Sequence, residues 1–413
     1  MHQDRLRNYA RLAIRVGVNL QPGQPLVIGY WHDPVLPEHV AFARLLVEEA
    51  YEAGASFVHV NYGDEGWLRQ TVQKGSLSLL EAKFRAEAAY VEQLAQEGAA
   101  FLRIPAGDPA LFAGLDATRI GTVDRVWNEA YEAFNFKRTN GDYSWSLVSA
   151  PTASWAATVH PELPEDRQVE ALWEDILFCS RASGDDPVTA WQEHLTTLRA
   201  RCTKLNELRI QTLHYEGPGT DLTVELPKTH FFATGGGSTR EGVKYVSNMP
   251  TEEVYSVPLR HGVNGKVTST MPLNHAGALI EGIELEFVDG RIVKYDAQKG
   301  RDALAHIIEA DEGSHYLGEI ALVPVNSPIA ERGVLFYNTL FDENASCHLA
   351  IGKAYPLIEG GRDLARKDWL AHGLNDSLMH VDFMIGSDQL DITATTIQGK
   401  VVPILQKGKF VLA

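Results

Sequence analysis

Residues 25–63 read PLVIGYWHDPVLPEHVAFARLLVEEAYEAGASFVHVNYG, and their pattern indicates the fold class of the first half of the chain. PLVIGY (25–30) and FVHVNYG (57–63) are short apolar runs bounded by turn residues, which is typical of buried strands. Between them, residues 37–55 have the apolar spacing of an amphipathic helix that ends at Gly54. The stretch therefore predicts a strand, a helix and a second strand.

The same alternation continues further along the chain. Another amphipathic helix is expected next, and AFLRIP (100–105) follows it as a strand. The apolar face of that helix consists of Leu80, Phe84, Ala88, Val91 and Ala95. Strands that alternate with helices favour a parallel sheet with right-handed crossovers. This is a Rossmann-like arrangement, but no GxGxxG follows the first strand, so the sequence does not indicate a dinucleotide.

The second half has the period of strands. After a helical stretch near 186–206, Leu222, Val224 and Leu226 alternate with polar residues. Ile283, Leu285 and Phe287 do the same and lead into an Asp289-Gly290 turn, which is typical of a hairpin.

Few helices are expected in this half, with short ones at 300–310 and 342–352. We therefore predict two domains: an α/β domain with a Rossmann-like parallel sheet at 1–190, and a β-rich α+β domain at 191–413. The boundary is placed to within about 20 residues.

Composition limits the classes of function. The 413 residues include 37 lysines and arginines against 54 aspartates and glutamates, a formal net charge of -17. Binding to nucleic acid rests on clustered cations, so no nucleic-acid partner is expected. No run approaches the roughly 18 apolar residues of a membrane span, and the N-terminus lacks the apolar core of a signal peptide. Three widely spaced cysteines are typical of reduced thiols, which predicts a cytoplasmic protein.

Acids and histidines of the second half stand in apolar or ordered segments. These are PTEEVYSVP (250–258), LGEIALVP (317–324), LFDENASCHLAIGKAYP (340–356) and HVDFMIGS (380–387). An isolated buried carboxylate costs several kcal/mol unless it is paired or bound to a cation. The only lysine or arginine in these segments is Lys353. A metal ion is the alternative source of positive charge.

His380 and Asp382 are two residues apart, so on a strand their side chains project from the same face. A nitrogen and a carboxylate oxygen suit zinc, cobalt or manganese. The pair also has a plain explanation, a buried hydrogen bond between the two side chains.

The other candidates have plain explanations as well. His348 alone is typical of a satisfied histidine, Glu252 and Glu253 of a solvated pair, and Glu343 of charge at a helix start. The joint occurrence of four acids and two histidines in such segments favours a metal cluster.

These motifs resemble the M29 family of metallo-aminopeptidases, the aminopeptidase T, PepS and AmpS group. The resemblance rests on NMPTEEVYSVP, GEIALVP, LFDENASCHLAIGKAY and HVDFMIG, and it includes ARLAIRVGVNLQPGQ and LLVEEAYEAGA near the N-terminus. It implies a homodimeric exopeptidase that removes N-terminal residues from peptides with a free N-terminus. Two divalent ions per subunit, zinc, cobalt, manganese or magnesium, would activate the water that attacks the peptide.

The resemblance also implies the site residues. The metal ligands would be Glu253, Glu319, Glu343, His348, His380 and Asp382, with Glu319 shared between the ions. Glu252 is either the proton acceptor or an exposed neighbour of a ligand. Tyr355 is either a donor to the developing oxyanion or a core tyrosine. The alternative functions are a metal-dependent hydrolase of another amide and a non-proteolytic metal-binding scaffold.

Overall fold

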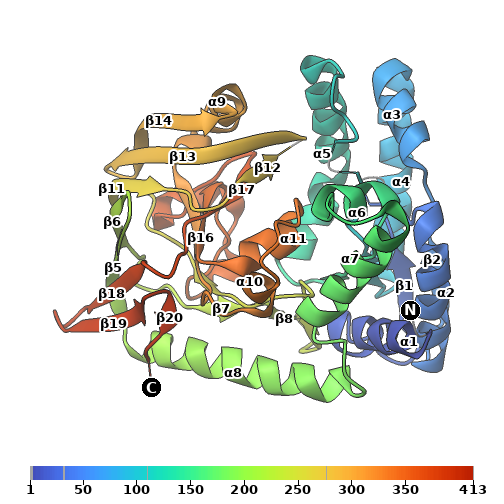
Figure 1. Cartoon of the computed structure of the whole chain (residues 1–413), viewed down its shortest axis with the longest axis horizontal. Coiled ribbons are helices and arrows are strands. Elements are labelled where there is room, and N and C mark those ends of the chain that lie inside the picture. Colours follow the sequence, from blue (N-terminus) through green and yellow to red (C-terminus); the bar gives the residue numbers. More distant parts are fainter. Residues whose placement is uncertain (1–2, 31–32, 109, 276, 413) are drawn as a thin grey trace. The chain divides into compact units, whose positions relative to one another are not determined.

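The computed structural model describes residues 3–30, 33–108, 110–275 and 277–412. The chain forms two compact units (Figure 1). The first ends at Glu193 and includes Gly236–Pro250, and the second begins at His194 and leaves out that segment. Among the described residues, no helix combines the length and the apolar character that a membrane crossing needs.

The first unit contains the predicted parallel sheet with helices around it. Its strands have the order β2-β1-β3-β4, and every pairing among them is parallel. The strands are β1 (Pro25–Ile28), β2 (Phe57–Val60), β3 (Ala100–Arg103) and β4 (Trp145–Leu147). The helices are α1 (Gln3–Leu12), η1 (Ala13–Gly17), η2 (Pro37–His39), α2 (Val40–Glu52), α3 (Glu65–Lys74), α4 (Leu77–Gln96), α5 (Ala117–Thr139), α6 (Ala153–Val159), α7 (Glu165–Cys179) and α8 (Pro187–Glu207), the last of which continues into the second unit.

Helix α4 shows why the apolar spacing predicted this layer. Ala88 and Val91 pack in one cluster with Phe101 of β3, while Leu80 and Phe84 pack with residues of α5. The apolar stripe of α4 therefore covers the sheet at one end and the neighbouring helix at the other. Burial of such a stripe supplies most of a helix's stability.

Segment 236–250 returns to the first unit after the chain has entered the second. Its strands β8 (Gly236–Ser238) and β9 (Lys244–Val246) pair with each other. The segment then reaches the edge of the parallel sheet, where Leu147 N–H donates to the carbonyl of Ser247 at 2.7 Å and Met249 N–H donates back to Leu147 at 3.0 Å. The predicted division of the chain at a single boundary near residue 190 does not include this return to the first unit.

The second unit consists mainly of two antiparallel sheets. The larger has the order β12-β13-β11-β6-β5-β18-β19-β20, with β14 beside β13, and the smaller has the order β17-β16-β15-β10-β7. The strands are β5 (Ile210–Gly217), β6 (Thr220–Glu225), β7 (Ala233–Thr234), β10 (Val254–Ser256), β11 (Val263–Thr268), β12 (Leu273–His275), β13 (Ala278–Val288), β14 (Arg291–Lys299), β15 (Leu317–Leu322), β16 (His348–Gly352), β17 (His380–Met384), β18 (Asp391–Thr396), β19 (Val401–Gln406) and β20 (Lys409–Phe410).

The helices of this unit are short. They are α9 (Arg301–Ile308), η3 (Gly313–His315), α10 (Pro328–Arg332), α11 (Thr339–Asp342), η4 (Glu343–Ala345), η5 (Gly361–Asp363), η6 (Arg366–Asp368) and η7 (Leu370–His372). Helix α9 lies where a helix was predicted, and the hairpin turn is also confirmed. Asp289 and Gly290 have φ of 48° and 81° and join β13 to β14, as expected for a turn with two positive φ values.

The predicted helix at 342–352 is wrong. Residues 339–345 form α11 and η4, but His348–Gly352 is strand β16. The run HLAIG is apolar after its histidine and buried at every position, and a short run of this kind does not distinguish a strand from a buried helix. Pairing with β15 on one side and β17 on the other decides the matter.

Candidate metal centre

The smaller sheet of the second unit has two chemically different faces. Alternate residues of β10, β15, β16 and β17 pack into the apolar core of the unit, and they are Val254, Ile320, Leu322, Leu349, Ile351, Val381 and Phe383. The residues between them lie on the opposite face, because side chains along a strand alternate. That face carries most of the predicted ligands.

Strand register brings these ligands level with one another. Ala350 of β16 pairs with Glu319 of β15 on one side and with Asp382 of β17 on the other. His348 lies two residues from Ala350, and His380 lies two residues from Asp382, so all four ligands project from one face. Residues distant in sequence thus meet above a single alanine.

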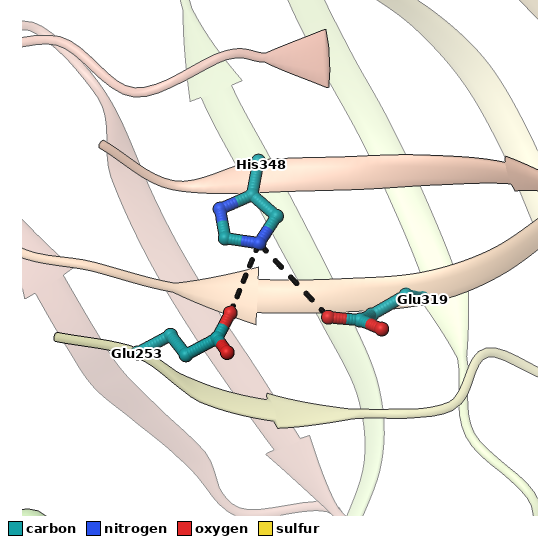
Figure 2. Close-up of side chains that lie close together, drawn as sticks. All are labelled: Glu253, Glu319 and His348. Carbon is teal, nitrogen blue, oxygen red and sulfur yellow. Dashed lines mark ion pairs between the residues drawn. The ribbon is translucent and has the colours of Figure 1, made fainter. Parts of the chain in front are cut away.

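Two of these side chains form the tightest group together with Glu253. Glu253, Glu319 and His348 each offer one ligand atom within 4.8 Å of the others. Nε2 of His348 lies 3.1 Å from Oε2 of Glu253 and 3.9 Å from Oε1 of Glu319. Figure 2 shows the two carboxylates and the imidazole pointing toward one another. Glu253 directly precedes β10.

His380 and Asp382 extend this group along the face. Nε2 of His380 lies 3.6 Å from Oε2 of Glu319 and 3.7 Å from Oδ1 of Asp382. The sixth predicted ligand, Glu343, is the first residue of η4 and is half-buried. Its carboxyl group is close enough to Asp382, Glu253 and Glu319 for their charges to act on it.

Small residues make room for this convergence. Ala350 presents only a methyl group between Glu319 and Asp382. Gly352, with φ of 105°, and Gly318 leave no space for a side chain. A Cβ on Gly352 would collide with the carbonyl oxygen of Met379, and one on Gly318 would collide with that of Gly352. The backbones therefore approach closely beside the ligands.

Backbone carbonyls orient both histidines. A carbonyl oxygen can only accept, so Nδ1 of His348 donates to Ser346 at 3.2 Å and Nδ1 of His380 donates to Lys353 at 2.7 Å. In each neutral ring the lone pair is then on Nε2, the nitrogen that faces the carboxylates. Metal-binding histidines are commonly held in this way.

The carboxylates repel one another where they are buried. Burial, with repulsion from Glu253 and Asp382, raises the pKa of Glu319 well above its usual value. Burial and repulsion from Asp382, Glu253, Glu319 and Asp342 do the same to Glu343. For His348, burial lowers the pKa, but the hydrogen bond to Glu253 and the surrounding charges raise it overall.

A divalent cation fits these residues. Oδ1 of Asp382 is buried and accepts no hydrogen bond from the part of the chain that the structure describes. Together with the repulsion between carboxylates, this orphaned oxygen leaves a demand for positive charge that the described cations do not meet at this position. The donor set of imidazole nitrogen and carboxylate oxygen suits zinc, cobalt and manganese.

Comparison with known proteins agrees with this geometry. The sequence model of the family described as thermophilic metalloprotease (M29) matches residues 2–410. The chain belongs to the M29 family. Membership implies a divalent metal ion, and the group of Glu253, Glu319 and His348 could bind one.

Individual M29 proteins are similar along the whole chain. Aminopeptidase AmpS of Bacillus subtilis (strain 168) is 42% identical over 407 residues, 98% of this chain and 98% of that protein. Aminopeptidase T of Thermus aquaticus is 39% identical over 412 residues, 99% of each. The solved structure of wild-type AmpT from Thermus thermophilus has a TM-score of 0.89 at 37% identity and covers 99% of each chain.

The structure also places the two predicted catalytic residues of this M29 chain. Glu252 is buried and its Oε1 lies 3.8 Å from Nε2 of His194, whereas its neighbour Glu253 reaches His348. The ring of Tyr355 lies edge-on to that of His380, with centroids 5.2 Å apart. Tyr355 is half-buried and therefore is not a fully enclosed core residue.

Three further residues near the M29 cluster were not found by sequence reasoning. Tyr255, two residues after Glu253, lies 6.4 Å from the ring of Tyr355, and its alternation with Glu253 was a signal for a shared face. Asn344 bonds the backbone of Glu252, and His194 approaches from α8. No sequence pattern singles out His194, because it is separated from the motifs by many residues.

Proposed function

We propose that this protein is a metal-dependent aminopeptidase that uses two divalent ions. The observation that carries the proposal is the convergence of Glu253, Glu319 and His348 on one face of the small sheet, in a chain of a metalloprotease family. The similar proteins AmpS and aminopeptidase T, whose names describe aminopeptidases, support the reaction.

Charge balance supports two ions. The six proposed ligands, Glu253, Glu319, Glu343, His348, His380 and Asp382, include four carboxylates. Four ionised carboxylates balance the charge of two divalent cations, whereas a single cation would leave two negative charges in a buried site. An unbalanced buried charge is strongly destabilising. Glu319, which lies between His348 and His380, is the carboxylate that we propose to be shared.

The bound ions would supply Lewis acidity to the scissile carbonyl and to the attacking water. The residues of the chain contribute the remaining steps. Glu252 is the carboxylate that we propose to accept the proton of the water and pass it to the leaving amine. Tyr355, whose ring lies beside that of His380, would donate a hydrogen bond from its hydroxyl to the oxygen that becomes negative. The net charge of -17 would attract the α-ammonium group of the peptide toward the chain.

The test compares leucyl-p-nitroanilide with its N-acetylated analogue. The enzyme should cleave only the free amine, lose turnover on chelation and regain it with zinc or cobalt. Glu319→Gln should abolish turnover and lower the metal content, while Glu284→Gln, on an exposed position of β13, should change neither. If the wild type binds metal but cleaves neither substrate, the reaction is misassigned, and a hydrolase of another amide or a non-proteolytic scaffold becomes the better description.

The homodimer and the cytoplasmic location stay predictions. Sedimentation velocity on the metal-loaded chain tests the first, because a dimer would have twice the mass of the 413-residue chain. The identity of the two ions is tested by metal analysis of protein purified without added metal.

A further inference from the structure

The Thr251-Glu252 peptide group is held by a side chain at each end. Its carbonyl oxygen accepts a hydrogen bond from Nε2 of His194 at 2.7 Å. Its N–H donates to Oδ1 of Asn344 at 2.7 Å. Strand β10 begins only at Val254, so ladder pairing does not hold this peptide. Two side chains do so instead.

These two side chains come from different elements and are both buried. His194 belongs to α8 and its side chain is 8% exposed. Asn344 belongs to η4 and is fully buried. Hydrogen bonds inside a protein are stronger than in water, and an unmet buried backbone group is costly. The peptide group is therefore fixed in a defined orientation.

The remaining hydrogen-bonding groups of Asn344 fix the orientation of its amide. Nδ2 donates to the carbonyl of Leu340 at 3.0 Å and to Oε1 of Glu343 at 3.4 Å. The backbone carbonyl of Asn344 accepts from Oγ of Ser327 at 2.9 Å. Exchanging the amide oxygen and nitrogen would set two donors or two acceptors against each other. Asn344 thus connects the segment that carries Glu253 to the carboxylate of Glu343.

The orientation of this peptide decides which way two adjacent carboxylates point. Glu253 reaches Nε2 of His348 at 3.1 Å, while Glu252 lies beside His194 at 3.8 Å. Rotation of the peptide plane would turn Glu253 away from the cluster. A small displacement is enough to weaken a metal site, since ligands must be placed to within about 0.2 Å.

We propose that His194 and Asn344 are positioning residues that clamp the Thr251-Glu252 peptide and thereby set the affinity of the cluster for divalent ions. The inference rests on the proposed metal site and adds to it two residues that touch neither ion nor substrate. Loss of an outer contact of this kind typically weakens metal binding by about 10- to 100-fold.

The experiment measures the dissociation constant for Zn²⁺ in the full chain, by competition with a chromogenic chelator. His194→Phe keeps a ring but removes the donor, and Asn344→Leu removes the acceptor. Each should raise the dissociation constant by about 10- to 100-fold. His194→Gln, which restores a donor, should bring it back toward the wild-type value. The double variant should bind no more weakly than the weaker single variant, because both contacts act on one peptide.

Ser269→Ala is the matched control. It removes the buried hydrogen bond that the N–H of Ile283 donates to Oγ of Ser269 at 2.9 Å in the larger sheet, so it should lower the unfolding temperature of the metal-free protein without changing the dissociation constant. If Asn344→Leu does not fold, the proposal is tested by comparing the Zn²⁺ dissociation constants of His194→Phe and His194→Gln.

Two outcomes overturn the inference in distinguishable ways. If the wild type binds Zn²⁺, Glu319→Gln abolishes binding and the folded clamp variants bind as tightly as the wild type, the clamp fails and the metal site stands. If the wild type binds no Zn²⁺, Co²⁺ or Mn²⁺, the metal site fails and the clamp with it.

Discussion

Replacing Ala350 by valine should fill the space in which the proposed ligands meet. Ala350 is the register partner of both Glu319 and Asp382. Neighbouring strands lie roughly 4.8 Å apart, so the two acidic residues rise from strands on either side of this methyl group. His380 lies 3.6 Å from one carboxylate and 3.7 Å from the other. The ligand atoms thus converge above residue 350.

The magnitude follows from what valine adds there. Two extra heavy atoms on a fully buried strand position force the neighbours apart, at a cost of about 1 to 3 kcal/mol in folding free energy. Valine is compatible with a strand, so the backbone itself should remain intact. The carboxylates and His380 are the side chains that must move. We expect the affinity for zinc to fall on the order of 100-fold, which is at least as large as the effect of losing one outer-sphere contact.

The assay measures unfolding by urea in the metal-free protein and the Zn²⁺ dissociation constant separately. Ile351→Val is the control, since Ile351 lies next in sequence but packs in the apolar core on the other face. It should cost about 1 kcal/mol of stability and leave the dissociation constant unchanged. If Ala350→Val binds zinc as tightly as the wild type, the ligands do not converge above this residue and the account of the site is refuted.

Three further predictions concern other parts of the chain. Burial lowers the pKa of His39 from 6.5 to about 4. As the pH falls, His39 is therefore protonated in the unfolded chain before it is protonated in the folded chain. Its contribution to the free energy of unfolding is fully present above pH 6.5, and about 3 kcal/mol of it is lost as the pH drops to 4. Urea unfolding at pH 7 and 4.5 should show this loss of stability, and His39→Phe should abolish the pH dependence. Burial raises the pKa of Cys202 and Cys347 to about 12; mass spectrometry should detect no alkylation of these two thiols in the native protein. Cys347→Ala should retain turnover, and a loss of turnover would indicate that this thiol is the nucleophile. Phe84→Ala should cost about 3 to 5 kcal/mol of the folding free energy of the first unit and leave the Zn²⁺ dissociation constant unchanged, since Phe84 of α4 packs against α5.

The elements that the sequence predicted are those whose apolar pattern is local. The strand at 25–28, the helix at 77–96 and the hairpin turn at 289–290 each follow from residues within one short window. The strand at 348–352 was missed because its conformation depends on β15 and β17, which lie apart from it in sequence. The return of Gly236–Pro250 to the first unit likewise depends on a tertiary contact with β4, and the residues within the segment do not predict it.

The same distinction between local pattern and distant contacts applies to the residues of the site. The spacing of His380 and Asp382 was enough to predict a shared face, because alternation is a property of any strand. The spacing of the motif does not show which of the adjacent residues Glu252 and Glu253 is the proposed metal ligand. We infer that this choice depends on the contacts of the preceding Thr251-Glu252 peptide with His194 and Asn344, which are side chains from other elements. Sequence motifs thus identified residue types, while partners across the fold determine their directions.

The charged face of the small sheet depends on its apolar face. Each strand that contributes a ligand also contributes alternate side chains to the core, among them Leu349, Ile351, Val381 and Phe383. Full burial of such a side chain stabilises the fold by about 1.5 to 3 kcal/mol, so the four together offset part of the several kcal/mol that each unpaired buried carboxylate costs. The same alternation that carries the ligands toward one another therefore supplies part of the free energy that holds them together. A short apolar strand interrupted by acids and histidines at every second position is the sequence form of that arrangement.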